Sequence, residues 1–142
     1  MRVHVVSDVH GRADALARAA DGADALVCLG DLLLFLDYAD YGQGIFADLF
    51  GAEAAGRYVA LRTAKKFDEA REYSLGLFAS RPESRTSLFE TAMRRQYAEM
   101  FGALPEPAYL TYGNVDVPAM WERFTKPGHH VIDGGTAELD GW

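Results

Sequence analysis

The sequence is poor in cysteine, in basic residues and in long apolar runs. Its single cysteine, Cys28, excludes an internal disulfide and favours a reducing compartment, so we expect a cytoplasmic protein. No apolar run reaches the ~18 residues of a membrane span, so we expect no membrane partner. Lys and Arg number 14 against 21 Asp and Glu, a net charge of −7. This acidic balance argues against general nucleic-acid binding, which requires a basic face.

The composition is otherwise that of an ordinary globular chain. Apolar residues make up 49% and charged residues 25% of 142 positions, which predicts a single domain spanning residues 1–142. Short β-branched runs at residues 2–7 and 25–29 predict strands, and the Ala/Leu-rich segment 14–20 between them predicts a helix. Together they form a βαβ unit with parallel strands, and residues 108–112 predict a further strand. The fold class is therefore α/β.

The middle of the chain has a helical pattern instead. Apolar residues recur at three- and four-residue steps over 58–78 and again over 87–101, which predicts two amphipathic helices. We interpret residues from about 37 to 102 as an insertion with a helical hairpin, and helices that only pack are the alternative. Near the end, residues 130–132 and 136–139 predict a β-hairpin across Asp133-Gly134-Gly135.

Polar side chains follow three of the predicted strands. The motifs are Asp8-Val9-His10, Gly30-Asp31 and Gly113-Asn114. Parallel sheets place ligand sites at the edge where the strands end. Asp8 and His10 can hold one cation there, Asp31 can bridge it to a second, and the amide oxygen of Asn114 can complete the second site. Such ligands suit Mn, Fe or Zn. Each motif alone is more often an ordinary turn, whereas the ordered combination favours a metal site.

These motifs resemble a known family. Val5-Val6-Ser7-Asp8-Val9-His10-Gly11, Leu29-Gly30-Asp31 and Tyr112-Gly113-Asn114 are similar to the first three signature blocks of the calcineurin-like metallophosphoesterases. The resemblance implies an αββα sandwich, here its N-terminal part with a helical insertion. It also implies a metal-dependent phosphoesterase that hydrolyses a phosphomonoester or phosphodiester with a hydroxide activated by two divalent ions. Asp8, His10, Asp31 and Asn114 would be the metal ligands, and Asp31 and Asn114 would also be catalytic.

Two departures from the family pattern bear on this interpretation. The family usually has a His after the third-block Asn, where it helps to protonate the leaving group, but this chain has Val115. The family's later His ligands are also missing, since Gly128-His129-His130 lacks the required spacing. We therefore expect this chain to be the N-terminal half of such an enzyme. Its partners would be the phosphate-ester substrate and either the C-terminal half or a second copy at an exposed sheet edge.

Two other functions remain open. With four candidate ligands, the chain could be a non-catalytic interaction module or an inactive fragment with an incomplete metal cage. A phosphatase with an Asp nucleophile is less favoured, because that chemistry requires Asp-x-Asp after the first strand and His10 occupies the second of these positions.

Overall fold

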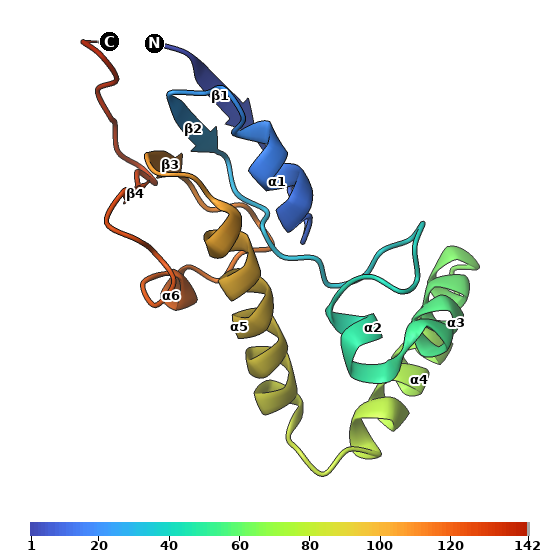
Figure 1. Ribbon diagram of the computed structural model, residues 1–142. Coiled ribbons are helices and arrows are strands. Elements are labelled where there is room, and N and C mark those ends of the chain that lie inside the picture. Colours follow the sequence, from blue (N-terminus) through green and yellow to red (C-terminus); the bar gives the residue numbers. More distant parts are fainter. Residues whose placement is uncertain (142) are drawn as a thin grey trace. The chain divides into compact units, whose positions relative to one another are not determined.

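A parallel β-sheet forms the frame of the protein. The computed structural model describes residues 1–141. Its sheet has four strands in the spatial order β1-β2-β3-β4, namely Val3–Val6, Ala25–Cys28, Ala108–Leu110 and His129–Val131 (Figure 1). Every neighbouring pair is parallel, so all strands end at the same edge of the sheet. The predicted α/β class is confirmed, and the sheet is consistent with part of a metallophosphoesterase fold.

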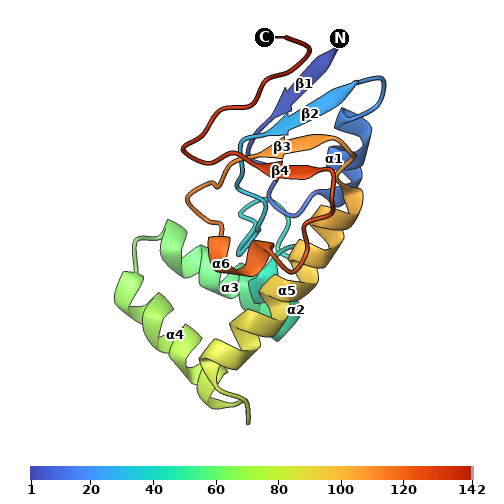
Figure 2. The same ribbon diagram turned by 90° about the vertical axis from the view of Figure 1, so that its left-hand side faces the viewer.

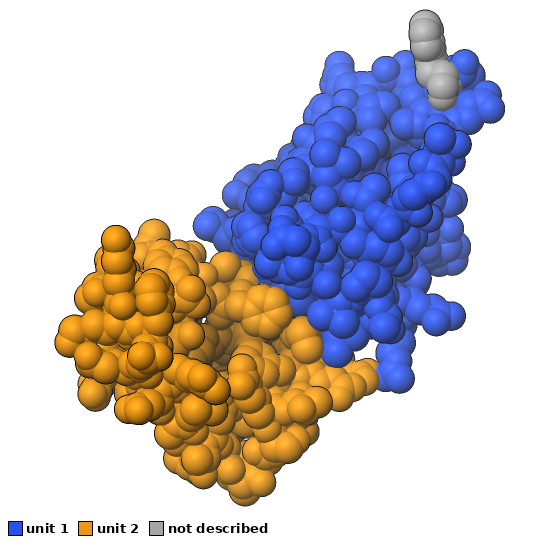
Figure 3. Space-filling model, turned by 180° about the vertical axis from the view of Figure 1, so that it is seen from behind, with its two compact units in different colours: residues 1–33, 95–142 blue, residues 34–94 orange. Residues whose placement is uncertain are grey.

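The chain divides into two compact units, which Figure 3 colours separately. The sheet unit comprises Met1–Leu33 and Arg95–Trp142, and the helical unit comprises Leu34–Arg94. The division falls within the long helix α5 (Arg85–Ala103). No helix among the described residues is both long and apolar enough to cross a bilayer.

The N-terminal βαβ unit forms as the sequence predicts. Helix α1 (Ala13–Ala19) connects β1 to β2, and these two strands pair in parallel from Val3 opposite Ala25 to Val6 opposite Cys28. One sheet face is covered by helices (Figure 2). On that face His4 Nδ1 donates to the Ala19 carbonyl of α1 at 2.7 Å. The other residues of the same row across the sheet are buried, and they are Leu26, Ala108 and His129.

The opposite face of the sheet is much less covered. Successive strand residues alternate between faces, so the row that begins at Val5 continues through Val27 and Tyr109 to His130. Val5 is 61% exposed and none of the four is fully buried. The Tyr109 and His130 rings stack at 5.0 Å between centroids, which shields part of this face.

Aromatic residues form a buried cluster in the core of the sheet unit. Trp121 of α6 (Pro118–Trp121) is 1% exposed and lies 5.2 Å, ring to ring, from Phe101 of α5. Phe101 also stacks on Phe124 at 6.2 Å, and Tyr97 contacts Trp121 at 6.3 Å. Burial of a side chain such as Phe101 contributes about 1.5–3 kcal/mol. This cluster fixes the end of α5 and, with it, the loop after β3.

Aromatic side chains also hold the helical unit together. It contains α2 (Ile45–Phe50), α3 (Ala52–Thr63), α4 (Phe67–Ala79) and residues 85–94 of α5. Phe46 packs on Phe50 at 5.2 Å and on Tyr58 at 4.8 Å. Phe50 meets Phe78 at 4.9 Å, and Phe78 meets Phe89 at 5.2 Å. These rings link all of its helices into one core.

The prediction of one continuous helix over 58–78 is wrong. Helix α3 ends in a Schellman motif, in which Lys65 N–H donates to the Arg62 carbonyl and Lys66 N–H to the Leu61 carbonyl. Lys65 takes the left-handed conformation, φ 59°, that this cap requires. Glycine usually occupies this position, whereas a lysine there gives no sequence signal. The apolar periodicity continues through the break, so the pattern hides it.

The predicted β-hairpin near the end of the chain is also wrong. His129–Val131 does form a strand, but it pairs in parallel with β3. Residues 136–139 are not a strand, and they alternate between exposed and half-buried positions. The Gly135 N–H donates to the Ile132 carbonyl at 2.8 Å, so the predicted turn is present without a second strand. The pairing of β4 with β3 replaces the local pairing that the turn suggested.

Candidate metal site

Two of the predicted ligands lie on the loop that follows β1. Asp8 and His10 both have left-handed backbone, with φ of 53° and 43°. Residues other than glycine seldom adopt this conformation, and it costs free energy wherever it is imposed. Val9, between them, is buried, which turns the side chains on either side of it outward. The loop therefore presents a carboxylate and an imidazole together at the sheet edge.

The orientation of the His10 ring is fixed by a backbone acceptor. Its Nδ1 lies 3.0 Å from the carbonyl of Leu33, which can only accept, so Nδ1 carries the proton. The Nε2 atom is then the unprotonated nitrogen of the neutral ring and the one free to bind a cation. Nε2 lies 3.7 Å from Asp8 Oδ1. The side chains of His10 and Asp8 are 38% and 68% exposed, so solvent and ions reach them.

Asp31 is brought to the same place by the loop that follows β2. Its φ is 56°, also left-handed. The backbone N–H groups of His10 and Gly11 donate to the carbonyls of Asp31 and Leu32, both at 2.8 Å. These bonds extend the pairing of β1 and β2 beyond the strands and hold the two loops in register. The strained backbone is thus maintained by hydrogen bonds between the loops.

The three side chains converge closely enough to share a cation. One ligand atom each from Asp8, His10 and Asp31 can be chosen so that all lie within 4.8 Å of one another. Two carboxylates and one imidazole suit Mn, Fe or Zn. The donor set and its spacing therefore fit a divalent metal.

Glycines allow the loop after β3 to approach the loop after β2. A Cβ on Gly30 would lie 2.1 Å from the Gly113 nitrogen, and a Cβ on Gly113 would lie 2.2 Å from Asp31 Oδ1. No side chain fits at either position without moving the backbone. Val115 N–H donates to Asp31 Oδ1 at 3.0 Å, so the third loop also fixes the Asp31 carboxylate.

Asp116 joins the second and third loops. Its Oδ2 accepts from the N–H groups of Asp31 at 2.7 Å and Gly113 at 2.9 Å. Its Oδ1 accepts from the Leu32 N–H at 3.0 Å and lies 3.3 Å from the Tyr97 hydroxyl. One carboxylate thus accepts hydrogen bonds from residues 84 and 85 positions earlier in the chain. Asp116 therefore supports the backbone of Asp31 and Leu32 through their N–H groups.

Tyr97 connects this network to the core. Its hydroxyl accepts from the Val117 N–H at 2.7 Å and donates to Asp116. The ring is fully buried, and that burial raises the pKa of Tyr97 to about 12. The phenol is therefore neutral near pH 7 and acts as a hydrogen-bond donor to the carboxylate of Asp116.

Comparison with known proteins supports what this geometry suggests. The family model described as calcineurin-like phosphoesterase matches residues 1–139. The chain belongs to the calcineurin-like phosphoesterase family. A search of curated proteins found no match, and a search of solved structures found none either. Family membership supports a phosphoesterase hydrolase with a metal-binding group, for which Asp8, His10 and Asp31 are the candidates.

The fourth predicted ligand, Asn114, lies on the third loop. Asn114 is exposed and stands between Gly113 and Val115, whose N–H groups donate to Asp116 and Asp31. The backbone on both sides of Asn114 is therefore fixed to the Asp31 loop. Its role as a ligand remains a prediction. The valine that replaces the usual family histidine contributes its backbone N–H here.

The two adjacent histidines at positions 129 and 130 lie in β4, and both have other contacts. His129 is buried against Phe101, its Nδ1 accepts from the Lys126 N–H at 3.1 Å, and burial lowers its pKa. His130 stacks on Tyr109. Neither joins the group of Asp8, His10 and Asp31 in the described part of the chain.

Sequence reasoning missed Asp116 as a member of the site. The available signal was its position, two residues after Asn114 in a loop that already contained a candidate ligand. An aspartate in a turn usually bonds to its own neighbours, and the bond from Gly113 N–H is of that kind. The bonds from Asp31 and Leu32 depend on the spatial order of the strands, which local patterns do not reveal.

Proposed function

We propose that this protein hydrolyses a phosphomonoester or phosphodiester with the aid of two divalent metal ions, of the Mn, Fe or Zn class. The observation that carries the proposal is the convergence of Asp8, His10 and Asp31 at the edge where parallel strands end. The family match gives the reaction class. The acidic chain, with its single buried cysteine, is consistent with a cytoplasmic location.

Each side chain has a distinct role in the proposal. Asp8 and His10 Nε2 would hold one ion, Asp31 would bridge it to the second, and the amide oxygen of Asn114 would help to hold the second. The hydrogen bond from Val115 N–H to Asp31 Oδ1 keeps that carboxylate oriented before an ion arrives. When bound, paired divalent ions supply a nucleophile from water at neutral pH and polarise the phosphoryl oxygens.

The proposal includes a preference for esters with good leaving groups. No imidazole follows Asn114, and Val115 cannot donate a proton from its side chain. General-acid catalysis typically contributes about 10²–10⁴-fold to a rate, and that gain is largest for leaving groups that need protonation. Aryl phosphates have weakly basic phenolates as leaving groups, so they are the preferred test substrates.

The experiment is hydrolysis by the full chain of p-nitrophenyl phosphate and bis-p-nitrophenyl phosphate, with Mn, Fe or Zn added to protein stripped by chelator. We expect metal-dependent release of nitrophenolate. Asp8→Asn and Asp31→Asn should each lower kcat by about 10²-fold or more, since each removes an ionised metal ligand. Asn tolerates the left-handed backbone at both sites, so the fold should be kept.

The matched control is Asp133→Asn, an exposed aspartate on the turn after β4 that undergoes the same change of charge. It should keep wild-type activity. Activity that survives chelation, or full activity in Asp31→Asn, would refute the proposed role of the metal site.

The second candidate function is a non-catalytic module. It is favoured by the small number of ligands, since the described residues bring three His, Cys, Asp or Glu side chains into one group. Calorimetric titration with Mn distinguishes the two: binding of two equivalents supports the hydrolase, whereas a single weak site without hydrolysis supports the module.

A further inference from the structure

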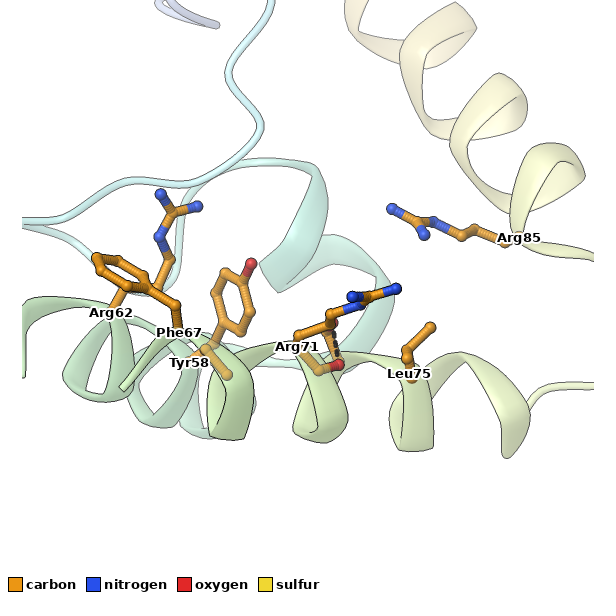
Figure 4. Close-up of a pocket in the computed structure, with 8 residues that line it drawn as sticks. Tyr58, Arg62, Phe67, Arg71, Leu75 and Arg85 are labelled. Carbon is orange, nitrogen blue, oxygen red and sulfur yellow. Dashed lines mark hydrogen bonds between the residues drawn. The ribbon is translucent and has the colours of Figure 1, made fainter. Parts of the chain in front are cut away.

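A second site lies wholly within the helical unit. A surface pocket of about 400 Å³ is lined by residues of α3, α4 and the first turn of α5. That volume is in the range of about 300–1,000 Å³ typical of small-molecule sites. Its most prominent feature is three arginines, Arg62, Arg71 and Arg85 (Figure 4). Their side chains come from three different helices.

The three guanidinium groups have no carboxylate partner among the described residues. Other cations of the same unit do have one, for example Lys66 with Glu69 at 3.1 Å. Arg85 instead lies over the Phe78 ring at 5.1 Å, and Arg62 lies over Tyr58 at 6.0 Å. Stacking on an aromatic ring leaves the N–H donors at the edge of the guanidinium free to bind an anion.

The side chains are arranged so that one anion can meet more than one of them. In Figure 4, Arg71 and Arg85 extend toward one another across the pocket. Each guanidinium can donate two parallel hydrogen bonds to a phosphate or carboxylate. Three unpaired positive charges around one hollow are unusual in a chain with a net charge of −7. Their mutual repulsion is relieved when an anion binds.

Apolar side chains form part of the remaining wall of the pocket, beside the polar Ser74. Phe67 and Leu75 line it and are 58% and 46% exposed, and the Tyr58 ring stands next to Phe67 (Figure 4). Exposed apolar surface of this kind gains free energy when a ligand covers it. An anion that carries a flat ring would satisfy both the arginines and this wall.

We propose that this pocket binds a small molecule with a phosphoryl group attached to a flat apolar ring. The phosphoryl dianion pairs with Arg71 and Arg85, with Arg62 adding a further positive charge, and the ring lies against Phe67 and Tyr58. A phosphoryl dianion is favoured over a carboxylate because two guanidinium groups extend toward one another and a third lines the same pocket. The proposal goes beyond the hydrolysis proposed above and does not depend on it.

The test measures binding of phenylphosphonate, which phosphoesterases cannot hydrolyse, to the full chain in the presence of EDTA. Removing metal keeps the probe from the Asp8–His10–Asp31 group, so the result is independent of catalysis. We expect one equivalent to bind, methylphosphonate to bind more weakly for lack of a ring, and benzoate to bind more weakly for lack of a second charge. Equal affinity for phenylphosphonate and methylphosphonate would refute the role assigned to the apolar wall.

Arg71→Gln is the decisive variant, and Arg57→Gln is its control. Arg57 carries the same charge in the same unit but stacks on Tyr73 at 4.7 Å and does not line the pocket. Arg71→Gln should weaken phenylphosphonate binding roughly fivefold, about 1 kcal/mol, the upper end of what an exposed ion pair contributes. Arg57→Gln should leave it unchanged, and circular dichroism should show both variants folded. No binding by the wild type, or equal weakening in both variants, would overturn the proposal.

Discussion

Replacing Asp116 by Asn tests whether one carboxylate supports the loops of the metal site. The change keeps the size of the side chain and replaces one acceptor oxygen by an NH₂ donor. Each Asp116 oxygen now receives two donors, from Asp31 and Gly113 on Oδ2 and from Leu32 and Tyr97 on Oδ1. Either orientation of the amide therefore places a donor against at least one backbone N–H.

The less costly orientation turns the NH₂ group toward the Oδ1 position. The Tyr97 hydroxyl can rotate and accept from it, whereas the Leu32 N–H cannot, and Leu32 is fully buried. A hydrogen bond to a charged group contributes about 1.5–3 kcal/mol, and a buried donor without a partner costs about 1–3 kcal/mol. Since Asp116 itself is half-buried, we expect a loss of about 2 kcal/mol.

Thermal unfolding of the chelator-stripped protein measures this loss. At about 4 °C per kcal/mol for a chain of this size, Tm should fall by about 8 °C. Mn affinity should fall about 10–100-fold, as is usual when a partner that orients a metal ligand is removed. Asp133→Asn, with the same change of charge on an exposed turn, should change neither quantity. An Asp116→Asn protein whose Tm lies within about 1 °C of wild type would refute the reasoning.

Two further predictions concern the same network. Gly113→Ala should lower both stability and Mn affinity, since its Cβ would lie 2.2 Å from Asp31 Oδ1. The control is Gly76→Ala in α4, where an added Cβ meets open space, and it should raise the free energy of unfolding by about 0.5–1 kcal/mol. Changes in Tm of the same sign for both variants in calorimetry would contradict this prediction. Because burial holds the pKa of Tyr97 at about 12, against 10 unfolded, its neutral form contributes stability that is complete below pH 10. About 3 kcal/mol of the free energy of unfolding is then lost as the pH rises from 10 to 12. Urea unfolding at several pH values measures this loss, and Tyr97→Phe should flatten the decline. An equal decline in the Phe variant would contradict its assignment to Tyr97.

Local patterns predict the first part of the fold well. The strands at Val3–Val6 and Ala25–Cys28 are short apolar runs, and the helix at Ala13–Ala19 is rich in alanine. Each of these signals lies within a few neighbouring residues, so the sequence contains it directly. The parallel pairing of the two strands then follows from the helix that connects them. This pairing is also what brings Asp8 and His10 beside Asp31.

Other parts of the fold depend on contacts that no local pattern contains. The break between α3 and α4 rests on a lysine in a glycine conformation, and the strand at His129–Val131 pairs with β3 rather than with the residues after its turn. Asp116 likewise gains its role from Asp31 and Leu32, which become its neighbours only when β2 and β3 lie side by side. Residues so far apart along the chain leave no periodicity to detect.

The backbone itself gives an independent reason to regard the loops after β1 and β2 as functional. Asp8, His10 and Asp31 all have φ between 43° and 56°, a conformation that costs about 1–3 kcal/mol at a residue other than glycine. Glycine at these positions would fold more easily and would bring no ligand atom. The hydrogen bonds from the His10 and Gly11 N–H groups and the Asp116 carboxylate offset that cost. Stability alone does not explain three strained side chains directed at one point. A cation held by all three, as proposed above, would give a physical reason for the strain.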